Sequence, residues 1–335
     1  FFSINEFAIW LNDQKHDKTF VICDNNTSKF CLPLLLRLRD SLIVIEIKNG
    51  EQHKTLGDCE LIWEELMQKG ATRSSLIINL GGGMITDIGA FAAATFKRGL
   101  NFVNIPTTLL GMVDAAIGSK TGINFKGVKN QIGTFSHPNA LVIETAFFNT
   151  LPEIELISGL GEVMKYGLID SPNLFLNSKS HKDFLNKEII KKCIGIKDDV
   201  VKNDPFEHGW RQILNFGHTI GHALESYSLN TSKPLKHGEA VAWGMLAECY
   251  LSEQILGFKE LEIVKQKTFE IFSYPAFIKE MQSFEQITEY LKHDKKNVAN
   301  EIRCTLLLQI GKPKTGVSVS VAQIENALLW LQKLK

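Results

Sequence analysis

Residues 76–87 read LIINLGGGMITD and decide how the first half of the chain folds. A short run of β-forming residues is followed at once by three glycines and by a helical stretch over 85–96. Glycines at such a junction let the backbone approach an anion, and the free N–H groups of the first helical turn point at it. We therefore predict a strand, a phosphate-binding turn and a helix. A tight turn without a ligand is the alternative, because a G-x-G-x-x-G motif would need Gly or Ala where Thr86 stands.

The same alternation continues on both sides of this stretch. Apolar runs bounded by turn residues predict further strands at 20–23, 42–47, 101–105 and 140–143, and helical spacing predicts a helix over 55–69. Strands that alternate with helices favour a mostly parallel sheet covered by helices. After about residue 151 long helical patterns dominate, over 153–169, 183–203, 215–227, 238–255 and 259–271, with a strand at 303–308. We predict an α/β domain over 1–150 and a mainly helical domain over 151–335.

Composition restricts the class of partner. The 335 residues include 37 basic and 37 acidic side chains, a balance that gives no sign of a nucleic-acid or membrane-surface partner. No apolar run reaches the ~18 residues that span a bilayer. The six cysteines are scattered without a C-x-x-C pair, which favours reduced thiols in a cytoplasm. The first residues do not resemble a signal peptide, and the missing initiator Met indicates that a few residues precede Phe1.

A second motif, PTTLLGMVDAAIGSKTGIN, covers residues 106–124 directly after the strand at 101–105, where open α/β sheets bind ligands. As the alternative to ligand binding for both hydroxyls, Thr107 could cap a helix with Thr108 at the first helical position. Asp114 falls within an apolar helical stretch, where a carboxylate is costly unless it is paired or functional. Lys120 could reach an anionic ligand, although a lone loop lysine is commonly a solvated surface group. We expect 116–139 to form a long loop or hairpin.

The strongest signal combines three segments, GEVMK at 161–165, NFGHTIGH at 215–222 and HGEA at 237–240. His218 and His222 are four residues apart and would share one face of a helix. Imidazoles and carboxylates are zinc ligands, and a catalytic zinc keeps one position open. The H-E-x-x-H metalloprotease motif is excluded because Thr219 stands in place of its glutamate. A single histidine would more readily be a hydrogen-bonded core residue, whereas three histidines and an acid flanked by glycines predict a metal site.

Basic residues form the fourth signal, at Lys197, Arg211 and in the run HDKKN at 293–297. Charge runs are commonly solvated faces, so not every member of the run is expected to bind a ligand. Arg211 lies four residues before Asn215, and on one helix the two would share a face that His218 and His222 continue.

Together these motifs resemble the 3-dehydroquinate synthase family of sugar phosphate cyclases over about residues 24–310. The resemblance implies an N-terminal Rossmann-like domain that binds NAD and a helical domain that carries the metal. It also implies Zn²⁺, with Co²⁺ as an alternative, held by Glu162, His218 and His237. His222 would then be a substrate or proton-relay residue instead of a ligand.

The resemblance assigns further positions. Those that match dinucleotide-binding positions of the family are Asp24, Glu51, Lys54, Gly82, Gly83, Asp87, Thr107, Thr108 and Lys129. Those that match the substrate pocket are Asp114, Lys120, Asn130, Lys165, Lys197, Arg211, Asn215 and one of Lys295 and Lys296. Arg98 matches an arginine associated with the substrate phosphate, and in a homodimer it would reach the neighbouring subunit. Three neighbours depart from the usual pattern, since Lys97 replaces an apolar residue, Ser119 a glycine and Gly161 an alanine.

The implied substrate is a small sugar phosphate, 3-deoxy-D-arabino-heptulosonate 7-phosphate, which would become 3-dehydroquinate and phosphate. NAD would be reduced and reoxidised around a β-elimination of phosphate, before ring opening and an aldol closure. Another sugar phosphate cyclase remains the nearest alternative, with its specificity at Asn130, Arg211, Asn215, His222 and Lys295 or Lys296. A polyol dehydrogenase would release NADH and would have no use for the cationic cluster. A non-catalytic NAD-binding protein would not need the metal set.

Overall fold

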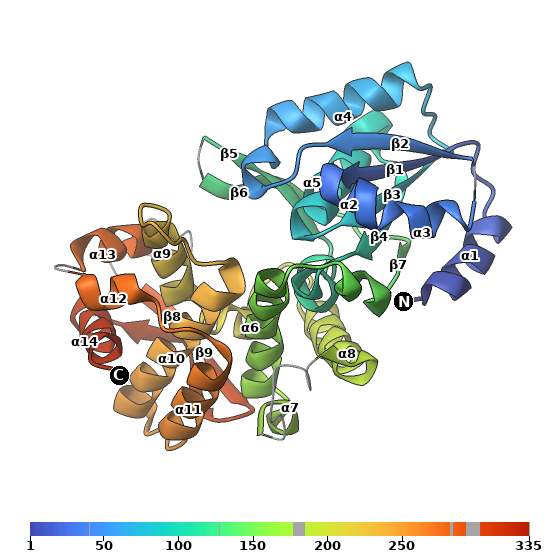
Figure 1. Ribbon diagram of the computed structural model, residues 1–335. Helices are drawn as coiled ribbons and strands as arrows, with labels where there is room; N and C mark the ends of the chain where they lie inside the picture. The colour runs from blue at the N-terminus through green and yellow to red at the C-terminus, as the bar shows by residue number, and fades with distance from the viewer. Residues whose placement is uncertain (40, 127, 177–184, 282–283, 293–301, 335) are drawn as a thin grey trace. The chain divides into compact units, whose positions relative to one another are not determined.

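The computed structural model describes residues 1–39, 41–126, 128–176, 185–281, 284–292 and 302–334. These residues form two compact units, Phe1–Pro152 and Glu153–Lys335 (Figure 1). The first is an α/β unit and the second is mainly helical, which confirms the predicted fold class.

A five-stranded parallel sheet forms the centre of the first unit, with strand order β2-β1-β3-β4-β7. The strands are β1 (Thr19–Asp24), β2 (Leu42–Ile47), β3 (Leu76–Gly81), β4 (Asn101–Pro106) and β7 (Ala140–Leu141). Every residue of β1 and β3 is buried, as expected for central strands covered on both faces. The carboxyl ends of β3 and β4 therefore lie side by side in the middle of the sheet, where ligands bind in this class of fold.

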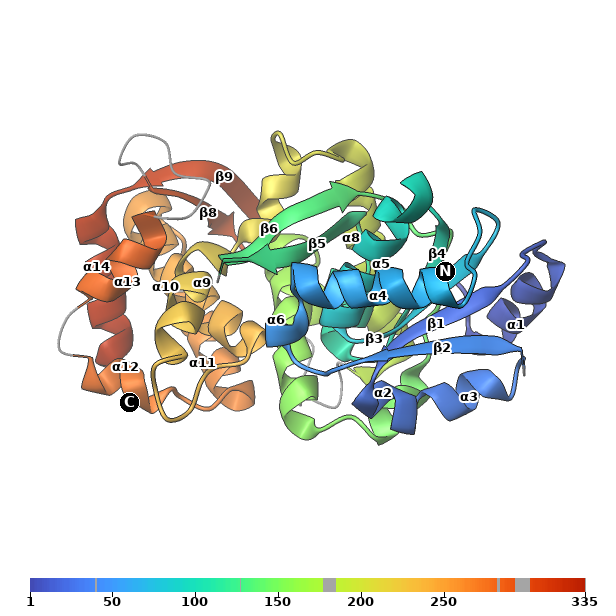
Figure 2. The same ribbon diagram turned by 90° about the horizontal axis from the view of Figure 1, so that it is seen from above.

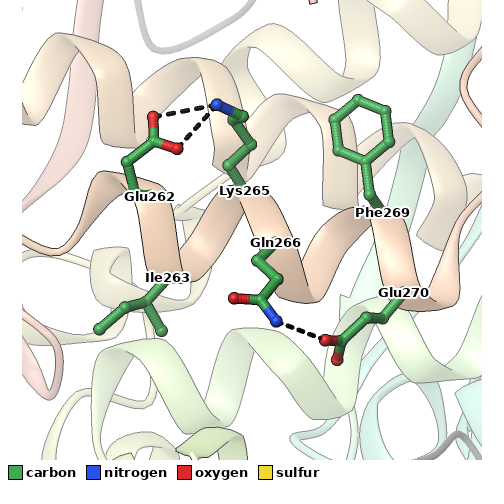
Figure 3. Close-up of a pocket in the computed structure, with 6 residues that line it drawn as sticks. All are labelled: Glu262, Ile263, Lys265, Gln266, Phe269 and Glu270. Atoms are coloured by element: carbon green, nitrogen blue, oxygen red, sulfur yellow. Dashed lines mark hydrogen bonds and ion pairs between the residues drawn. The ribbon is translucent and has the colours of Figure 1, made fainter. Parts of the chain in front are cut away.

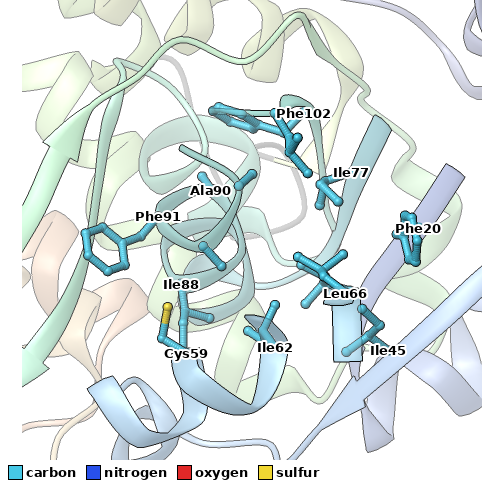
Figure 4. Packing of buried hydrophobic residues seen from close by; sticks show 14 of the residues in the cluster. Phe20, Ile45, Cys59, Ile62, Leu66, Ile77, Ile88, Ala90, Phe91 and Phe102 are labelled. Atoms are coloured by element: carbon cyan, nitrogen blue, oxygen red, sulfur yellow. The ribbon is translucent and has the colours of Figure 1, made fainter. Parts of the chain in front are cut away.

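Helices cover the sheet and close its hydrophobic core. They are α1 (Ile4–Asp13), α2 (Asn25–Phe30), α3 (Leu32–Leu36), α4 (Leu56–Gln68) and α5 (Gly83–Thr95), with 3₁₀ turns at Glu51–His53, Phe96–Arg98 and Thr145–Asn149. Figure 4 shows Ile62 and Leu66 of α4 and Ile88 of α5 packed toward Ile77 and Phe102 of the sheet. Burying each such side chain stabilises the fold by about 1.5–3 kcal/mol. This packing fixes the first turn of α5 at the end of β3.

The long segment predicted as a loop or hairpin is a hairpin. A π-helical turn, Gly111–Ala115, leads into β5 (Lys120–Phe125), which pairs antiparallel with β6 (Val128–Phe135). The helix expected to reach Phe96 ends at Thr95, because Lys97 (φ 50°) and Arg98 (φ 71°) adopt left-handed conformations that leave the helical path.

The second unit is built around α10 (His237–Leu256), which packs against α6, α9, α11 and α14 (Figures 1 and 2). Most of α10 is buried, including Trp243 with no exposed surface, as expected for a central helix. The other elements are α6 (Glu153–Ile169), α7 (Pro172–Leu176), α8 (Lys187–Asn203), a 3₁₀ helix at Trp210–Asn215, α9 (His218–Ser228), α11 (Leu261–Ile271), α12 (Ala276–Glu280), α13 (Glu285–Lys292), α14 (Val321–Gln332) and the antiparallel strands β8 (Ile302–Gln309) and β9 (Lys312–Val319). The sequence predicted the first of these two strands and missed the second.

Two further findings bear on the expected partners and compartment. Within the residues that the structure describes, no helix combines the length and the hydrophobicity needed to cross a bilayer. All six cysteines are buried free thiols.

Candidate metal centre and cofactor turn

Glycines allow α6 and α10 to cross in direct backbone contact. A Cβ atom on Gly161 would lie 2.1 Å from the carbonyl oxygen of Gly238, and one on Gly238 would lie 1.6 Å from that of Ser158. Real Cβ atoms do not approach backbone this closely, so a side chain at either position would require the two helix backbones to shift apart. Glu162 follows Gly161, and His237 precedes Gly238. The crossing therefore brings their side chains to the same place.

The start of α9 is fixed by α10 in a different way. Gly217, just before the helix, has a φ of 81°, and a Cβ there would lie 2.2 Å from Cγ of Met245. The fully buried carboxylate of Glu248 on α10 accepts the N–H groups of Gly217 at 2.6 Å and Ile220 at 3.3 Å. An acceptor at this position caps the helix and complements its dipole. His218, the first residue of α9, is thereby held in place.

The predicted continuous helical face from Arg211 to His222 is wrong. Asn215 ends a 3₁₀ helix and α9 begins only at His218, because the left-handed Gly217 interrupts the helical path. The prediction that His218 and His222 share a face of one helix is confirmed, since both lie on α9 with ring centroids 5.2 Å apart.

Glu162, His218 and His237 converge with spacings that suit a metal ion. Oε1 of Glu162 lies 3.4 Å from Nε2 of His218 and 3.5 Å from Nε2 of His237. The carboxylate is fully buried, and no described group gives either oxygen a hydrogen bond of ordinary geometry. Tetrahedral zinc bonds of about 2.0–2.1 Å separate ligand atoms by roughly 3.3–3.4 Å. The three atoms therefore fit around a zinc-sized cation.

His222 is a competing ligand. Its nearest ring nitrogen and those of His218 and His237 all lie within 4.8 Å of one another, so three imidazoles could also hold a metal. His222 is exposed to solvent, whereas Glu162 is fully buried and approaches both other histidines. A buried carboxylate needs polar partners or cations around it, whereas an exposed imidazole is solvated by water. The set Glu162, His218 and His237 stays our prediction.

Electrostatics prepare these side chains for a metal. Burial alone would raise the pKa of Glu162, but the positive charge of Lys165 and the contact with His218 hold that pKa well below its ordinary value. Burial and the charge of Lys165 lower the pKa of His218, which favours a neutral ring with a free lone pair. Burial would also lower the pKa of His237, but its close contacts with the carboxylates of Glu162 and Glu225 outweigh it and raise that pKa to about 9. A metal must displace a proton there.

The far nitrogens of both predicted histidine ligands have acceptors of their own. Nδ1 of His218 lies 3.2 Å from the carbonyl oxygen of Phe216, and Nδ1 of His237 lies 3.2 Å from Oε2 of Glu225. Both Nε2 atoms are thereby turned toward Glu162. Sequence reasoning missed Glu225, although its position seven residues after His218 on the same helix face was a usable signal.

Three cations predicted for the substrate pocket are buried in the second unit. Lys165 forms an ion pair with Glu162, Lys197 is 6% exposed on α8, and Arg211 is 2% exposed in the 3₁₀ helix. Buried charges are costly unless they are paired or serve a ligand. Lys295 and Lys296, which were also predicted for the substrate pocket, lie outside the described residues.

Asp204 organises the turn that carries Arg211. Its carboxylate accepts the backbone N–H groups of His208 and Gly209 at 2.8 Å and that of Arg211 at 2.9 Å. These bonds, the one from Arg211 first, lower the pKa of Asp204 to about 2. The guanidinium then donates through Nη1 to the carbonyl of Pro205 at 2.6 Å. Sequence reasoning missed Asp204.

Asn215 is positioned by another residue that sequence reasoning missed. Its Nδ2 donates to Oε1 of Glu207 at 2.8 Å, and Glu207 itself has a left-handed φ of 62°. The Asp-Pro pair and the glycine at 204–209 were signs of a turn, but a turn signal does not say which side chain it presents.

In the first unit the glycine turn is suited to a phosphate group. Gly82 precedes α5 and Gly83 begins it, and no described side chain caps this helix. A Cβ on Gly82 would lie 3.1 Å from Cγ2 of Thr108, and one on Gly83 would lie 3.1 Å from Cβ of Ala115. The bare backbone at the carboxyl end of a central parallel strand leaves N–H groups for an anion. The glycine turn therefore fits the phosphate groups of a dinucleotide.

The capping residue after β4 is Thr108, not Thr107 as the alternative without a ligand expected. Oγ1 of Thr108 accepts the N–H of Gly111 at 3.0 Å, which is the bond of a helix cap. The backbone N–H of Thr107 instead donates to the carbonyl of Gly81 at 2.9 Å. That bond ties the end of β4 to the glycine turn.

Lys54 joins residues predicted separately for cofactor and substrate. Its buried ammonium lies 2.5 Å from Oδ2 of Asp87, 2.6 Å from Oδ1 of Asn130 and 4.0 Å from Oε1 of Glu51. Burial would lower the pKa of Lys54, but attraction to Asp87 and Glu51 outweighs it and raises that pKa. A charged lysine thus links the start of α5 to Asn130 on the hairpin, where the left-handed φ of 53° presents that side chain.

The remaining predicted residues of this unit are dispersed. Asp24 uses Oδ1 to cap α2, accepting the N–H groups of Asn26 and Thr27 at 2.9 and 2.8 Å. Asp114 is half-buried in the π-helical turn, while Arg98, Lys120 and Lys129 are exposed. Ser119, before Lys120, has a φ of 65°, a conformation that favours the glycine it replaces.

A hollow on α11 is not a competing site. Figure 3 shows six residues of that one helix, in which Lys265 bonds Glu262 at 2.7 Å and Gln266 bonds Glu270 at 2.9 Å. These polar groups satisfy one another along the helix surface, as solvent-facing pairs do. None of the predicted site residues lines the hollow.

Solved structures share the whole architecture. A 2-epi-5-epi-valiolone synthase from Streptomyces hygroscopicus with NAD⁺ and Zn²⁺ bound is 25% identical, with a TM-score of 0.82 over 94% of this chain and 90% of that one. A 2-deoxy-scyllo-inosose synthase complexed with carbaglucose-6-phosphate, NAD⁺ and Co²⁺ is 23% identical, with a TM-score of 0.83 over 97% and 94%. Because the 2-deoxy-scyllo-inosose synthase is only 23% identical, its similarity shows the fold alone.

Family models and curated relatives agree on a narrower group. The model of the 3-dehydroquinate synthase N-terminal domain matches residues 44–158, and that of the C-terminal domain matches residues 159–297. The 3-dehydroquinate synthase of Parabacteroides distasonis is 40% identical over 333 residues, covering 97% of this chain and 94% of the relative. That of Clostridium tetani is 38% identical over 325 residues, covering 94% and 86%. The chain belongs to the 3-dehydroquinate synthase family.

Proposed function

We propose that this chain is an NAD- and metal-dependent 3-dehydroquinate synthase, which converts 3-deoxy-D-arabino-heptulosonate 7-phosphate into 3-dehydroquinate and phosphate. The observation that carries the proposal is the convergence of Glu162, His218 and His237 within 3.4–3.5 Å contacts in a member of that family. Relatives 38–40% identical over nearly the whole chain carry the same name. The reaction belongs to the shikimate pathway of aromatic amino-acid biosynthesis.

We assign the cofactor and the metal to different units. Gly82 and Gly83 would hold the NAD phosphates, with the Lys54 network beside them. Glu162, His218 and His237 would hold Zn²⁺ or Co²⁺, both of which accept nitrogen and oxygen ligands. When bound, NAD supplies hydride acceptance and return, and the metal supplies polarisation of the alcohol that is oxidised.

The chain's own cations would recognise the anionic substrate. The substrate carries a carboxylate and a phosphate, and Lys165, Lys197 and Arg211 are buried positive side chains in the unit of the metal residues. The guanidinium of Arg211 can bind either anion in a forked contact. Asn215 and the amide of Asn130 offer hydrogen bonds to hydroxyl groups, and Asp114, Lys120, Lys295 and Lys296 complete the proposed set.

We assign proton transfer to His222. Its exposed imidazole lies one helical turn from His218, with ring centroids 5.2 Å apart, and solvent can exchange its proton. Elimination of phosphate needs a proton removed from the carbon beside the oxidised position, and imidazole is suited to such a transfer near neutral pH.

We further propose a cytoplasmic homodimer. Arg98 lies at an exposed left-handed turn after α5 and would contact the phosphate bound by the partner subunit. Six buried free thiols agree with a reducing compartment.

Substrate choice separates this proposal from another sugar phosphate cyclase. Purified protein with NAD and Zn²⁺ is given either the heptulosonate phosphate or a heptulose phosphate that lacks the carboxylate, and released phosphate and carbocyclic product are measured. We expect dehydroquinate and phosphate in equal amounts from the carboxylated substrate alone. Faster turnover of the heptulose phosphate that lacks the carboxylate would assign the chain to a different cyclase activity.

A further inference from the structure

His237 lies between two carboxylates. Its Nε2 is 3.5 Å from Oε1 of Glu162, and its Nδ1 is 3.2 Å from Oε2 of Glu225. Glu225 comes from α9, whereas His237 begins α10 and Glu162 comes from α6. The imidazole is thus held from both of its nitrogens by groups on separate helices.

The burial of Glu225 calls for a role. Its residue is 8% exposed, and taking a carboxylate out of water is costly unless it is hydrogen-bonded or paired. The contact with His237 spans α9 and α10, so it is not a by-product of helix geometry within one element. A ligating histidine commonly donates its other ring N–H to a carboxylate or carbonyl, which sets its tautomer and direction.

We propose that Glu225 is a positioning residue for the metal ligand His237. By accepting a hydrogen bond from Nδ1–H, it keeps the proton on Nδ1 and leaves the lone pair of Nε2 facing Oε1 of Glu162, where the metal of the proposed function would lie. His218 has the same arrangement with the neutral carbonyl of Phe216 at 3.2 Å. Of these two histidines, only His237 has an anionic acceptor at Nδ1. Its imidazole is therefore the stronger electron donor to a metal.

The first test measures zinc affinity by competition with a chromophoric chelator. We expect Glu225→Ala to weaken zinc binding about 10- to 100-fold. Glu225→Gln should lose less, because its amide oxygen can still accept from Nδ1. Glu239→Gln is the matched control: Glu239 accepts the backbone N–H of Lys236 at 2.9 Å in the same helix start, and among the described residues it makes no hydrogen bond or ion pair with the ring of His237. It should bind zinc like the wild type. Wild-type affinity in Glu225→Ala would overturn the proposal.

A second measurement does not depend on any variant folding. Long-range ¹H–¹⁵N spectra of the zinc-loaded wild-type protein report which nitrogen of each histidine carries the proton. We expect His237 to be protonated on Nδ1 and to bind zinc through Nε2. Zinc on Nδ1 of His237, or no zinc on this ring, would overturn the proposal. Neither readout requires turnover, so a protein that binds zinc in this way but releases no phosphate would refute the proposed function alone.

Discussion

Glu162, His218, His222 and His237 offer more ligands than a catalytic zinc with three protein ligands requires. We expect Glu162→Ala, His218→Ala and His237→Ala each to lose zinc after dialysis, because each removes one of the three converging atoms. His222→Ala should keep about one zinc per chain and lose activity by 10²–10⁴-fold, the usual range for a proton-transfer group. Metal analysis of the four purified variants decides the assignment. Zinc lost from His222→Ala but kept in Glu162→Ala would replace the carboxylate by the third histidine.

Asp204 gives a prediction with a pH dependence. Because folding lowers its pKa from the ordinary 3.8 to about 2, its contribution to folding is present above pH 3.8 and is lost as the pH falls toward 2. Asp204→Asn should therefore be less stable than the wild type at pH 5, and the difference should shrink on acidification. Urea unfolding of both proteins at several pH values tests this. The variant should also raise KM for the substrate about tenfold, because the turn presenting Arg211 loses its acceptor.

The sequence predicted the metal ligands better than the residues that hold those ligands in position. Residue type and neighbouring glycines predicted a metal site among three histidines and a glutamate. The family resemblance selected Glu162, His218 and His237, and the structure brings these three together. Glu225 and Glu248 were missed because a single glutamate in a helical stretch is usually interpreted as a solvated surface residue. Their roles arise only where α9 and α10 cross, and a local pattern carries no information on which helices cross.

The close crossing of α6 and α10 should be needed for zinc binding. Gly161→Ala would place a methyl group 2.1 Å from the carbonyl oxygen of Gly238. The helices must separate, which moves Glu162 away from His237, so zinc affinity should fall at least tenfold, with a loss of roughly 1–3 kcal/mol in stability. Calorimetry with and without zinc measures both effects.

Gly195→Ala is the control for this substitution. It changes a helical glycine of α8 whose Cβ would meet no atom within 4 Å, so it should raise stability by up to about 1 kcal/mol and leave zinc binding unchanged. If Gly161→Ala behaves like Gly195→Ala, the contact between α6 and α10 does not position the metal residues.

Most elements were predictable because apolar runs and helical spacing reflect burial directly. The errors fall where the backbone leaves the common conformations. Gly217 separates α9 from the preceding 3₁₀ helix, and Lys97 and Arg98 end α5 early. Positive φ at lysine and arginine has no sequence signature, since neither residue favours that region. The strand β9 was missed because its alternating burial gives a weak pattern in a segment with a proline, a glycine and two lysines.

For the whole molecule, the proposed dimer can be tested by complementation. Arg98→Ala and Glu162→Ala should each be nearly inactive alone. If Arg98 serves the partner's site, a hybrid dimer of the two contains one site with both residues intact. An equimolar mixture exchanged through mild denaturant should then recover about a quarter of wild-type activity, because half of the dimers are hybrids with one working site of two. An inactive mixture, with hybrid formation verified by mass spectrometry, would place Arg98 in its own subunit's site or outside any site.

NAD should be reduced and reoxidised within each turnover, because dehydroquinate and phosphate together carry no net oxidation of the substrate. The most direct measurement follows released phosphate and free NADH together while purified enzyme, with NAD and zinc, consumes the heptulosonate phosphate. We predict phosphate equal to the substrate consumed and no accumulation of free NADH. A phosphonate analogue that cannot eliminate should instead build up enzyme-bound NADH, to no more than about one equivalent per site. Free NADH that rises in proportion to the normal substrate consumed would mark an ordinary dehydrogenase and contradict the account.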